Sequence, residues 1–153
     1  MAFLSSLNIV ASGMTAQQLR LDVVAENVTN STTTRTEAGG PYRRKMVVFQ
    51  SVAGRDDFRA AMARAAGGLT PNAGAPTAGG VRVTQIVEDP SPMKLVYDPA
   101  HPDANEDGYV EMPNVDMVKE MTDAMAATQA YSANVTAFNT LKSVVAKGLE
   151  IGR

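Results

Sequence analysis

Apolar residues recur at every seventh position near both ends of the chain, a spacing typical of helices that pack along a narrow seam. The N-terminal seam consists of Leu4, Leu7, Met14, Leu21 and Val28. The C-terminal seam consists of Met117, Ala124, Tyr131, Phe138 and Val145, with Met121 and Val135 at partner positions. The pattern predicts one long helix over residues 4–28 and a second over residues 115–149.

The segment between these helices has the composition of a connector followed by short strands. Thr29–Tyr42 is rich in Thr, Asn and Gly, which end helices and form turns. Strands are predicted where apolar β-branched residues cluster or alternate, at Met46–Phe49, Val81–Glu88 and Lys94–Tyr97. Residues 67–80 are rich in Gly, Pro and Ala, and we expect them to form a mobile loop.

The predicted fold is α+β, with long N- and C-terminal helices packed as an antiparallel coiled-coil-like pair and a small loop-rich β region between them. Three parts follow: an N-terminal assembly helix (1–30), a connector with the β region (31–113) and a C-terminal assembly helix (114–153). The second helix is longer by roughly ten residues, and small residues flank both seams. Part of its surface is therefore expected to remain available to neighbouring chains.

The start of the second helix carries polar residues that suit a helix N-terminus. Asn114 follows Pro113 and is a candidate N-cap, while Asp116 and Glu120 place negative charge near the positive end of the helix dipole. The basic triplet Arg43–Lys45 precedes a predicted strand and is expected to be a solvated flank.

Composition and charge narrow the class of protein. With 44% hydrophobic but 5% aromatic residues, the chain suits helix-on-helix packing better than a thick core. A net charge of -2 provides no field that would attract nucleic acid or an anionic membrane. No apolar run is long enough to span a bilayer, so we expect neither nucleic-acid binding nor membrane insertion. The first residues lack the basic region of a cleavable signal peptide, so we expect none.

The residues that carry chemistry are too sparse to form a catalytic or cofactor site. His101 is the single histidine and Cys is absent, so neither a Ser-His-Asp triad nor a multi-histidine zinc site is available within one chain. The glycine pairs lack the spacing of a phosphate-binding loop. We therefore expect no enzyme activity and no cofactor.

One loop resembles a calcium site and leaves an alternative function open. Residues 103–108 match the first six positions of a calcium-binding loop, with Asp103, Asn105 and Asp107 at alternating places and Gly108 at the turn. The twelfth position, normally a bidentate Glu, is Asn114. A plain turn is the favoured interpretation, and a small calcium-dependent binding module over Asp103–Asn114 is the alternative.

The end of the first predicted helix carries a recognisable motif. Residues 12–18 and 24–33 contain an Asn-x-x-Asn signature at Asn27 and Asn30 that resembles the signature of bacterial flagellar rod and hook proteins. Further segments resemble the proximal-rod branch of that family, the FlgC type, and extend the likeness over nearly the whole chain except about residues 55–80: these are Thr33–Lys45, Glu88–Pro92, Val96–Ala104, Gly108–Val115 and Ala133–Asn139.

The resemblance implies a structural subunit of the flagellar basal-body rod, in the periplasm, that polymerises through its terminal helices and serves motility. It implies as partners further copies of the chain, other rod proteins and the adaptor protein at the rod base. It also implies export by the flagellar type III apparatus without a cleaved signal peptide. In such a subunit, Asn27 and Asn30 would end the first helix and tie the connector to it through side-chain hydrogen bonds to the backbone.

Overall fold

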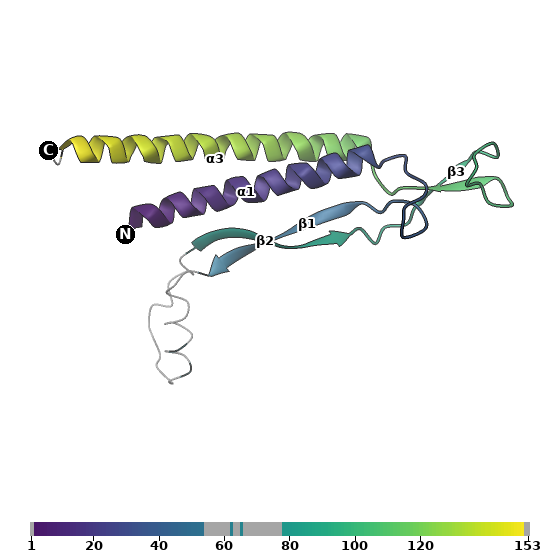
Figure 1. Cartoon of the computed structure of the whole chain (residues 1–153), viewed down its shortest axis with the longest axis horizontal. Helices are drawn as coiled ribbons and strands as arrows, with labels where there is room; N and C mark the ends of the chain where they lie inside the picture. The colour runs from purple at the N-terminus through teal and green to yellow at the C-terminus, as the bar shows by residue number, and fades with distance from the viewer. Residues whose placement is uncertain (1, 54–61, 63–64, 66–77, 152–153) are drawn as a thin grey trace. The chain divides into compact units, whose positions relative to one another are not determined.

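Two long helices dominate the fold, as predicted from the seven-residue spacing. A computed structural model describes residues 2–53, 62, 65 and 78–151 of the chain (Figure 1). Helix α1 spans Ala2–Thr29 and helix α3 spans Met117–Ile151. Both run without interruption, and a small β region separates them in sequence. The α+β prediction is confirmed.

The β region consists of two separate two-stranded sheets. Strand β1 (Lys45–Ala53) pairs with β2 (Ala78–Glu88). Strand β3 (Lys94–Tyr97) pairs antiparallel with β4 (Tyr109–Met112), so that Tyr97 lies opposite Tyr109. We did not predict β4, whose residues follow the Asp107-Gly108 turn. Gly108 has a φ of 80°, a conformation that glycine adopts at little cost, and it returns the chain alongside β3.

The loop predicted at residues 67–80 extends too far at its C-terminal end, because β2 already begins at Ala78. Residues 67–77 lie outside the part of the chain that the structure describes, whereas Ala78, Gly79 and Gly80 belong to β2. Gly80 has a φ of 109° and lies against the Ser12 side chain of α1, where a larger residue would not fit. Gly80 is therefore needed for the close packing of β2 against α1, and it does not belong to a loop.

The chain divides into two compact units, and each takes part of both helices. The first unit comprises Met1–Gln17, Phe49–Thr84 and Ala130–Arg153. The second unit comprises Gln18–Val48 and Gln85–Gln129.

Within each unit, α1 contacts both α3 and the β strands. In the first unit, Gly13 packs closely on Asn134 of α3, and the Ser12 hydroxyl accepts a 3.0 Å hydrogen bond from the Val81 amide of β2. In the second unit, Asn27 binds both Glu120 of α3 and the backbone of Lys45 in β1. Since Arg20 pairs with Asp123 and Asn27 with Glu120, the two helices of this unit run antiparallel.

The N-cap of α3 is Asp116, not Asn114 as we predicted. The Asp116 carboxylate accepts a 3.0 Å hydrogen bond from the Val118 amide, which satisfies one of the free N–H groups of the first turn. Asn114 stands outside the helix and is used elsewhere, because its side chain binds the backbone of Arg44, Asp89 and Ser91.

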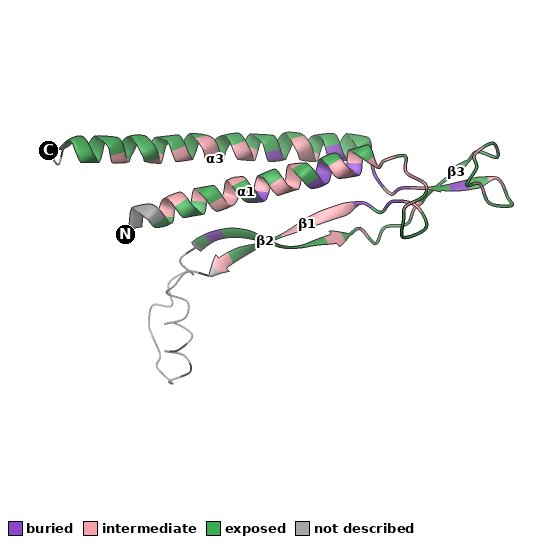
Figure 2. Cartoon of the chain, in the orientation of Figure 1, coloured by how far each residue is buried: buried purple, intermediate pink, exposed green. Residues whose placement is uncertain are grey.

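The hydrophobic core is small and lies mainly in the second unit (Figure 2). Its buried apolar side chains are Val23, Val24, Tyr42, Val110, Val115 and Ala127, joined by Pro113. Among the described residues of the first unit, Ala16 is the one buried apolar side chain. The larger apolar residues of the first unit are half-buried or exposed, so this unit leaves much of its apolar surface uncovered within a single chain.

The packing of Gly80 against α1 makes a testable prediction about stability. A Cβ at residue 80 would lie 2.4 Å from Ser12 Oγ and would also occupy a backbone conformation that L-residues avoid. We expect Gly80→Ala to lower the free energy of unfolding by about 1–3 kcal/mol. Gly148→Ala is the control, because nothing lies within 4 Å of its added Cβ and alanine favours helix by about 0.5–1 kcal/mol. Urea unfolding followed by circular dichroism compares them, and equal midpoints would contradict the packing.

Candidate functional site

A buried polar cluster joins the end of α1, the start of β1 and the start of α3. We call Asn27, Tyr42, Arg44, Glu120 and Asp123 the polar joint. Asn27 is 1% exposed and Glu120 is fully buried. The other buried residues described in their helices are apolar. Burial of polar side chains is costly unless every polar atom finds a partner.

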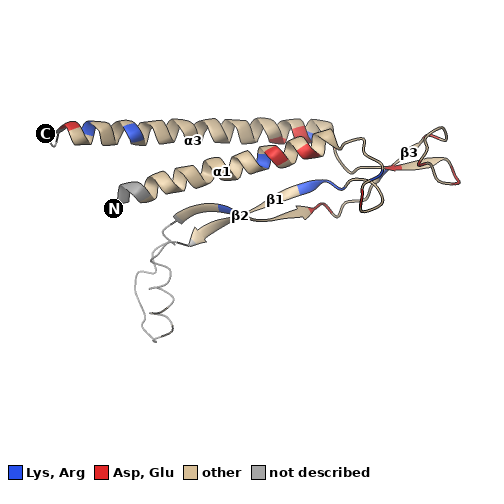
Figure 3. Ribbon diagram, viewed as in Figure 1, with Lys and Arg blue, Asp and Glu red and all other residues tan. Residues whose placement is uncertain are grey.

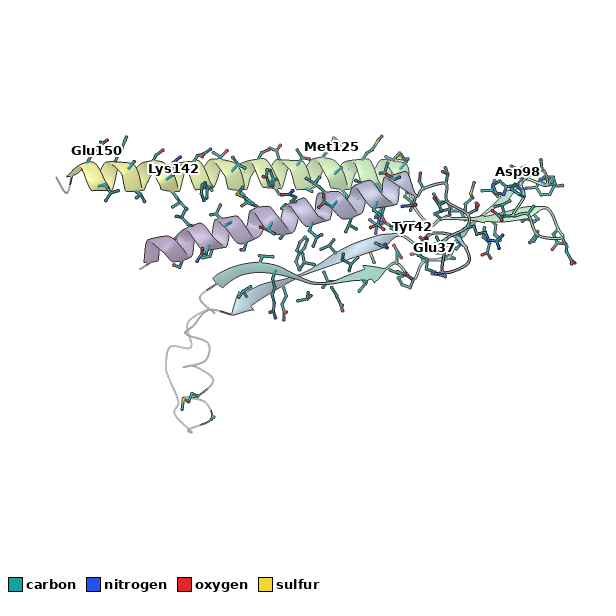
Figure 4. The ribbon with its side chains drawn as sticks, viewed as in Figure 1. Glu37, Tyr42, Asp98, Met125, Lys142 and Glu150 are labelled. Carbon is teal, nitrogen blue, oxygen red and sulfur yellow. The ribbon has the colours of Figure 1, made fainter. Side chains whose placement is uncertain are left out.

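Asn27 uses its full hydrogen-bonding capacity within the joint. Its side-chain Nδ2 donates to the Lys45 carbonyl at 2.9 Å and to Glu120 Oε2 at 3.0 Å. Its Oδ1 accepts from the Lys45 amide at 2.8 Å and from the Tyr42 hydroxyl at 3.0 Å. One amide side chain therefore completes the backbone pairing of β1 and holds α1 to α3 (Figure 4 labels Tyr42).

The charges of the joint are arranged around Arg44. Its Nε donates to Glu120 Oε1 at 2.6 Å, its Nη2 to Asp123 Oδ2 at 3.2 Å, and its Nη1 lies 3.5 Å from Asp89 Oδ2. The Arg44 side chain is only 8% exposed. Burial opposes its charge, but the hydrogen bond and charge of Glu120, with Asp123 and Asp89, outweigh burial and raise the pKa of Arg44.

Our expectation of a solvated basic flank was wrong for Arg44. Residues 43–45 enter β1 with alternating directions, so Arg44 turns inward while Arg43 is exposed. Lys45 is half-buried, forms an ion pair with Glu26 and lies 5.5 Å from the centre of the Tyr42 ring. The three consecutive cations thus have three different environments.

Backbone hydrogen bonds fix the chain that surrounds the joint. Asn114 Oδ1 accepts from the Arg44 amide at 2.8 Å, and its Nδ2 donates to the Asp89 carbonyl at 3.1 Å. The Asp89 amide donates to the Arg44 carbonyl at 2.8 Å. Hydrogen bonds from Ser91, together with the positive charge of Arg44, lower the pKa of Asp89 and keep it ionised opposite the guanidinium.

Asn30 of the Asn-x-x-Asn motif acts locally at the end of α1. Its Nδ2 donates to the Glu26 carbonyl at 2.9 Å, and its Oδ1 accepts from the Thr33 hydroxyl at 3.2 Å. Helix α1 ends one residue earlier, at Thr29. In the structure, Asn27 therefore links distant segments. Asn30 instead gives the Glu26 carbonyl a second hydrogen bond, beside the one from its own amide at 3.0 Å, and binds the first turn of the connector.

The N-terminal seam residues lie along α1 in half-buried positions. Leu7, Met14, Leu21 and Val28 are neither fully covered nor fully exposed, and the side chain of Leu4 lies outside the described residues. The buried positions of α1 are Ala16, Val23, Val24 and Asn27, beside the seam.

The C-terminal seam is half-buried over four of its heptads, with a different set of partner positions. Ala124, Tyr131, Phe138 and Val145 are half-buried, as is Val135, whereas Met117 and Met121 are 38% and 58% exposed. Most residues of α3 that are buried or half-buried form one stripe along the helix, which we call the covered stripe. It consists mainly of the half-buried seam residues and of the residues three positions after a seam residue, which are Glu120, Ala127, Asn134 and Leu141. We had placed the partners four residues after it, because Met121 and Val135 are more apolar than Glu120 and Asn134.

In the loop that resembles a calcium site, two of the three expected ligand side chains, Asp103 and Asn105, accept hydrogen bonds within the protein. Asp103 accepts a 2.8 Å hydrogen bond from the Thr34 hydroxyl. Asn105 Oδ1 accepts from the amides of Asp107 and Tyr109, which closes the turn between β3 and β4. Among the described residues, no group of three or more His, Cys, Asp or Glu is placed to hold a metal ion. Nor does any helix in that part of the chain have the length and apolarity to cross a membrane.

Sequence reasoning missed the buried partners of Asn27. Glu120 lies in phase with Ala127, Asn134 and Leu141, so its place on the covered stripe was available from the spacing. Its assignment to the helix N-terminus, as a partner of the helix dipole, concealed that signal. The burial of Arg44 could be found only from the structure. Its two basic neighbours, Arg43 and Lys45, suggested that all three side chains are exposed to solvent.

Comparison with known proteins identifies relatives over the whole chain. A family model described as "Flagella basal body rod protein" matches residues 7–35, and one described as "Flagellar basal body rod FlgEFG protein C-terminal" matches residues 106–151. The flagellar basal-body rod protein FlgC of Bacillus subtilis (strain 168) is 48% identical and covers 97% of each chain. That of Borreliella burgdorferi is 42% identical over 99% of this chain and 98% of its own, and that of Escherichia coli O6:H1 is 42% identical over both full lengths.

The buried charges of the joint predict strong energetic coupling. Removing one partner of a buried ion pair strands the other, so Glu120→Leu and Arg44→Met should each destabilise the chain by about 3–5 kcal/mol. The double variant should lose less than the sum of the two, by about 1–3 kcal/mol. Arg20→Ala is the control, since its ion pair with Asp123 is about one-third exposed on both sides and should be worth less than about 1 kcal/mol. Strict additivity in urea unfolding would refute the coupling.

Tyr42 predicts how stability changes at alkaline pH. Burial, followed by the charges of Glu26, Glu120 and Glu88, raises the pKa of Tyr42 from 10.0 to about 12. The folded state thus favours the neutral phenol, whose hydrogen donates to Asn27. The resulting stabilisation is complete below pH 10 and is lost as pH rises toward 12. Over this range the free energy of unfolding should fall more steeply for wild type than for Tyr42→Phe, and parallel profiles would contradict the assignment.

Proposed function

The chain belongs to the FlgC family of flagellar basal-body rod proteins, and on that premise we propose that it builds the proximal rod by packing its terminal helices against those of neighbouring subunits. One observation supports this mechanism above the others. Among the described residues of the first unit, the large seam side chains remain half-buried, and α3 further exposes Val144 and Leu149 by 60% and 72%.

The energy for assembly is the burial that a single chain leaves incomplete. Fully burying a Leu or Phe side chain contributes roughly 1.5–3 kcal/mol relative to leaving it exposed. The seam residues Leu7, Leu21, Tyr131 and Phe138 each have part of this contribution still to gain. Contacts between subunits would complete their burial, so the helix ends should become ordered on assembly.

The polar joint has a different part in this mechanism. Its partners come from α1, β1 and α3 and are satisfied within one chain. The joint therefore fixes the start of α3 against the end of α1 before any neighbour arrives, and the apolar seams extend from this fixed point. Order within the subunit and attachment between subunits then depend on separate sets of residues.

Family membership also supports the remaining parts of the proposal. The chain acts without catalysis, is exported by the flagellar type III apparatus without a cleaved signal peptide, and reaches the periplasmic part of the basal body. Its neighbours are further copies of itself, other rod proteins and the adaptor protein at the rod base.

Substitution in the seam tests the proposal. In a strain that lacks its own copy, Phe138→Asp should abolish swimming and the recovery of the chain in purified basal bodies, because a buried carboxylate without a partner would disrupt the contact. Asn139→Asp is the matched control, since it adds the same charge at the adjacent exposed position and should swim like wild type.

A second arm separates the rod function from the calcium-dependent alternative. Deleting residues 1–28 removes most of α1 and should abolish flagellation. A calcium module over Asp103–Asn114 would tolerate the deletion. Wild-type swimming by either Phe138→Asp or the deletion variant would overturn the proposed mechanism.

A further inference from the structure

The β3–β4 hairpin carries an exposed apolar face. Leu95, Tyr97 and Tyr109 are 64%, 65% and 43% exposed. Leu95 and Tyr97 alternate along β3 and therefore share one face, and Tyr109 lies on that face because it pairs with Tyr97. We call these three residues and Glu111, the partner of Leu95, the outer face of the hairpin.

The opposite face of the hairpin anchors it within the second unit. Val110 is 1% exposed, and Lys94 Nζ donates to the Val115 carbonyl at 2.6 Å. Since an isolated two-stranded hairpin is marginally stable, this anchorage is what allows the hairpin to present its outer face. The exposure of the outer face is therefore a feature of an ordered element.

The outer face is also held in a fixed shape. The rings of Tyr97 and Tyr109 meet edge to face with centroids 5.3 Å apart. Gly108 lies against the Tyr97 ring, where a Cβ would come within 3.0 Å of Cε2. Rigid, exposed aromatic side chains lose little entropy on binding and are typical anchors of protein interfaces.

Charge indicates what the outer face binds. The hairpin and its loop carry Asp98, Asp103, Glu106, Asp107 and Glu111 against Lys94 (Figure 3). The second unit as a whole has thirteen Asp and Glu and seven Lys and Arg. The first unit has three Asp and Glu and seven Lys and Arg, so the chain is acidic in one unit and basic in the other.

The C-terminal part of α3 has the complementary chemistry. Lys142 and Lys147 are exposed, and between and beside them lie the exposed apolar residues Val144 and Leu149. Lys142 and Leu149 are seven residues apart and share one face of the helix, whereas Val144 and Lys147 lie on the opposite face. The face with Lys142 and Leu149 offers apolar area and positive charge, whereas the outer face of the hairpin offers apolar area and negative charge.

We propose that the outer face of the hairpin in one subunit docks on the face of α3 that carries Lys142 and Leu149 in a second copy of the chain. The inference rests on the proposed function, because it supplies a contact for the same assembly. A contact between two different surfaces of identical chains is heterologous and continues from copy to copy, as a ring or as an open helical array. Each single contact is small, and repetition around the rod adds the contacts together.

Reciprocal charge reversal tests this contact in solution. Sedimentation of the full-length protein should show self-association that weakens by about tenfold or more as NaCl rises from about 0.05 to about 0.3 M. Glu106→Lys/Asp107→Lys and Lys142→Glu should each weaken association about tenfold, and an equimolar mixture of the two should restore it, which excludes misfolding as the cause. Lys147→Glu makes the same charge change on the opposite face of α3 and should leave association unchanged. The control Asp22→Lys/Glu37→Lys makes the same charge change as the acidic reversal at exposed sites outside the hairpin.

The absence of native cysteine allows a second test in the assembled rod. Two differently tagged copies, one with Tyr97→Cys and one with Leu149→Cys, are expressed together and oxidised in purified basal bodies. A disulfide-linked product carrying both tags is expected, and none with the control pair Asp22→Cys and Leu149→Cys. Absence of the product from swimming cells, an unrestored mixture or salt-independent association would each overturn the docking and leave the rod function intact. Failure of the wild-type chain to enter basal bodies would instead overturn the proposed function.

Discussion

The fold depends on one fully used amide, the side chain of Asn27. Its two hydrogens and two acceptor positions go to Glu120, to the Tyr42 hydroxyl and to both backbone groups of Lys45. No other described side chain ties the first helix to both the second helix and the sheet through so many bonds. A shorter or an ionised side chain would leave at least one of these buried partners unsatisfied. In the Asn-x-x-Asn motif, the first residue, Asn27, therefore holds α1, β1 and α3 together. The second residue, Asn30, stabilises the end of α1.

Burying the charge of Arg44 in the second unit costs desolvation free energy, and the acidic side chains around it offset that cost. Arg44 brings a positive charge into a site with an exposed fraction of 8%, and Glu120 balances it at 2.6 Å with Asp89 and Asp123 nearby. Buried ion pairs contribute little net stability compared with apolar packing of the same volume, but they penalise wrong registers heavily. A helix pair joined only by small and apolar residues could slide by one heptad. In this chain such a slide would separate Glu120 from Arg44 and Asn27, so the joint sets the register.

The sequence predicted the elements well and the joint poorly, for identifiable physical reasons. Both helices follow from an apolar spacing of seven, and three strands follow from clusters of β-branched residues. Strand β4 was missed because Tyr109–Met112 is short and becomes a strand only by pairing with β3. Arg44, Asn114 and Glu120 were each assigned a local role, as a solvated flank, an N-cap and a dipole partner. Their contacts with Arg44 and Asn27 join residues 70 to 93 positions apart, which no local pattern encodes.

The distribution of apolar burial explains how a small chain can be both ordered and ready to assemble. The second unit closes its core with few residues and satisfies its buried charges internally. The first unit leaves its large apolar side chains half-buried or exposed, and in the proposed mechanism neighbouring subunits would complete their burial. Had the first unit also closed a complete core, little free energy would remain for attachment. The two units therefore differ in role: one defines the shape of the subunit, and in the proposed mechanism the other retains the apolar surface through which neighbouring subunits would attach.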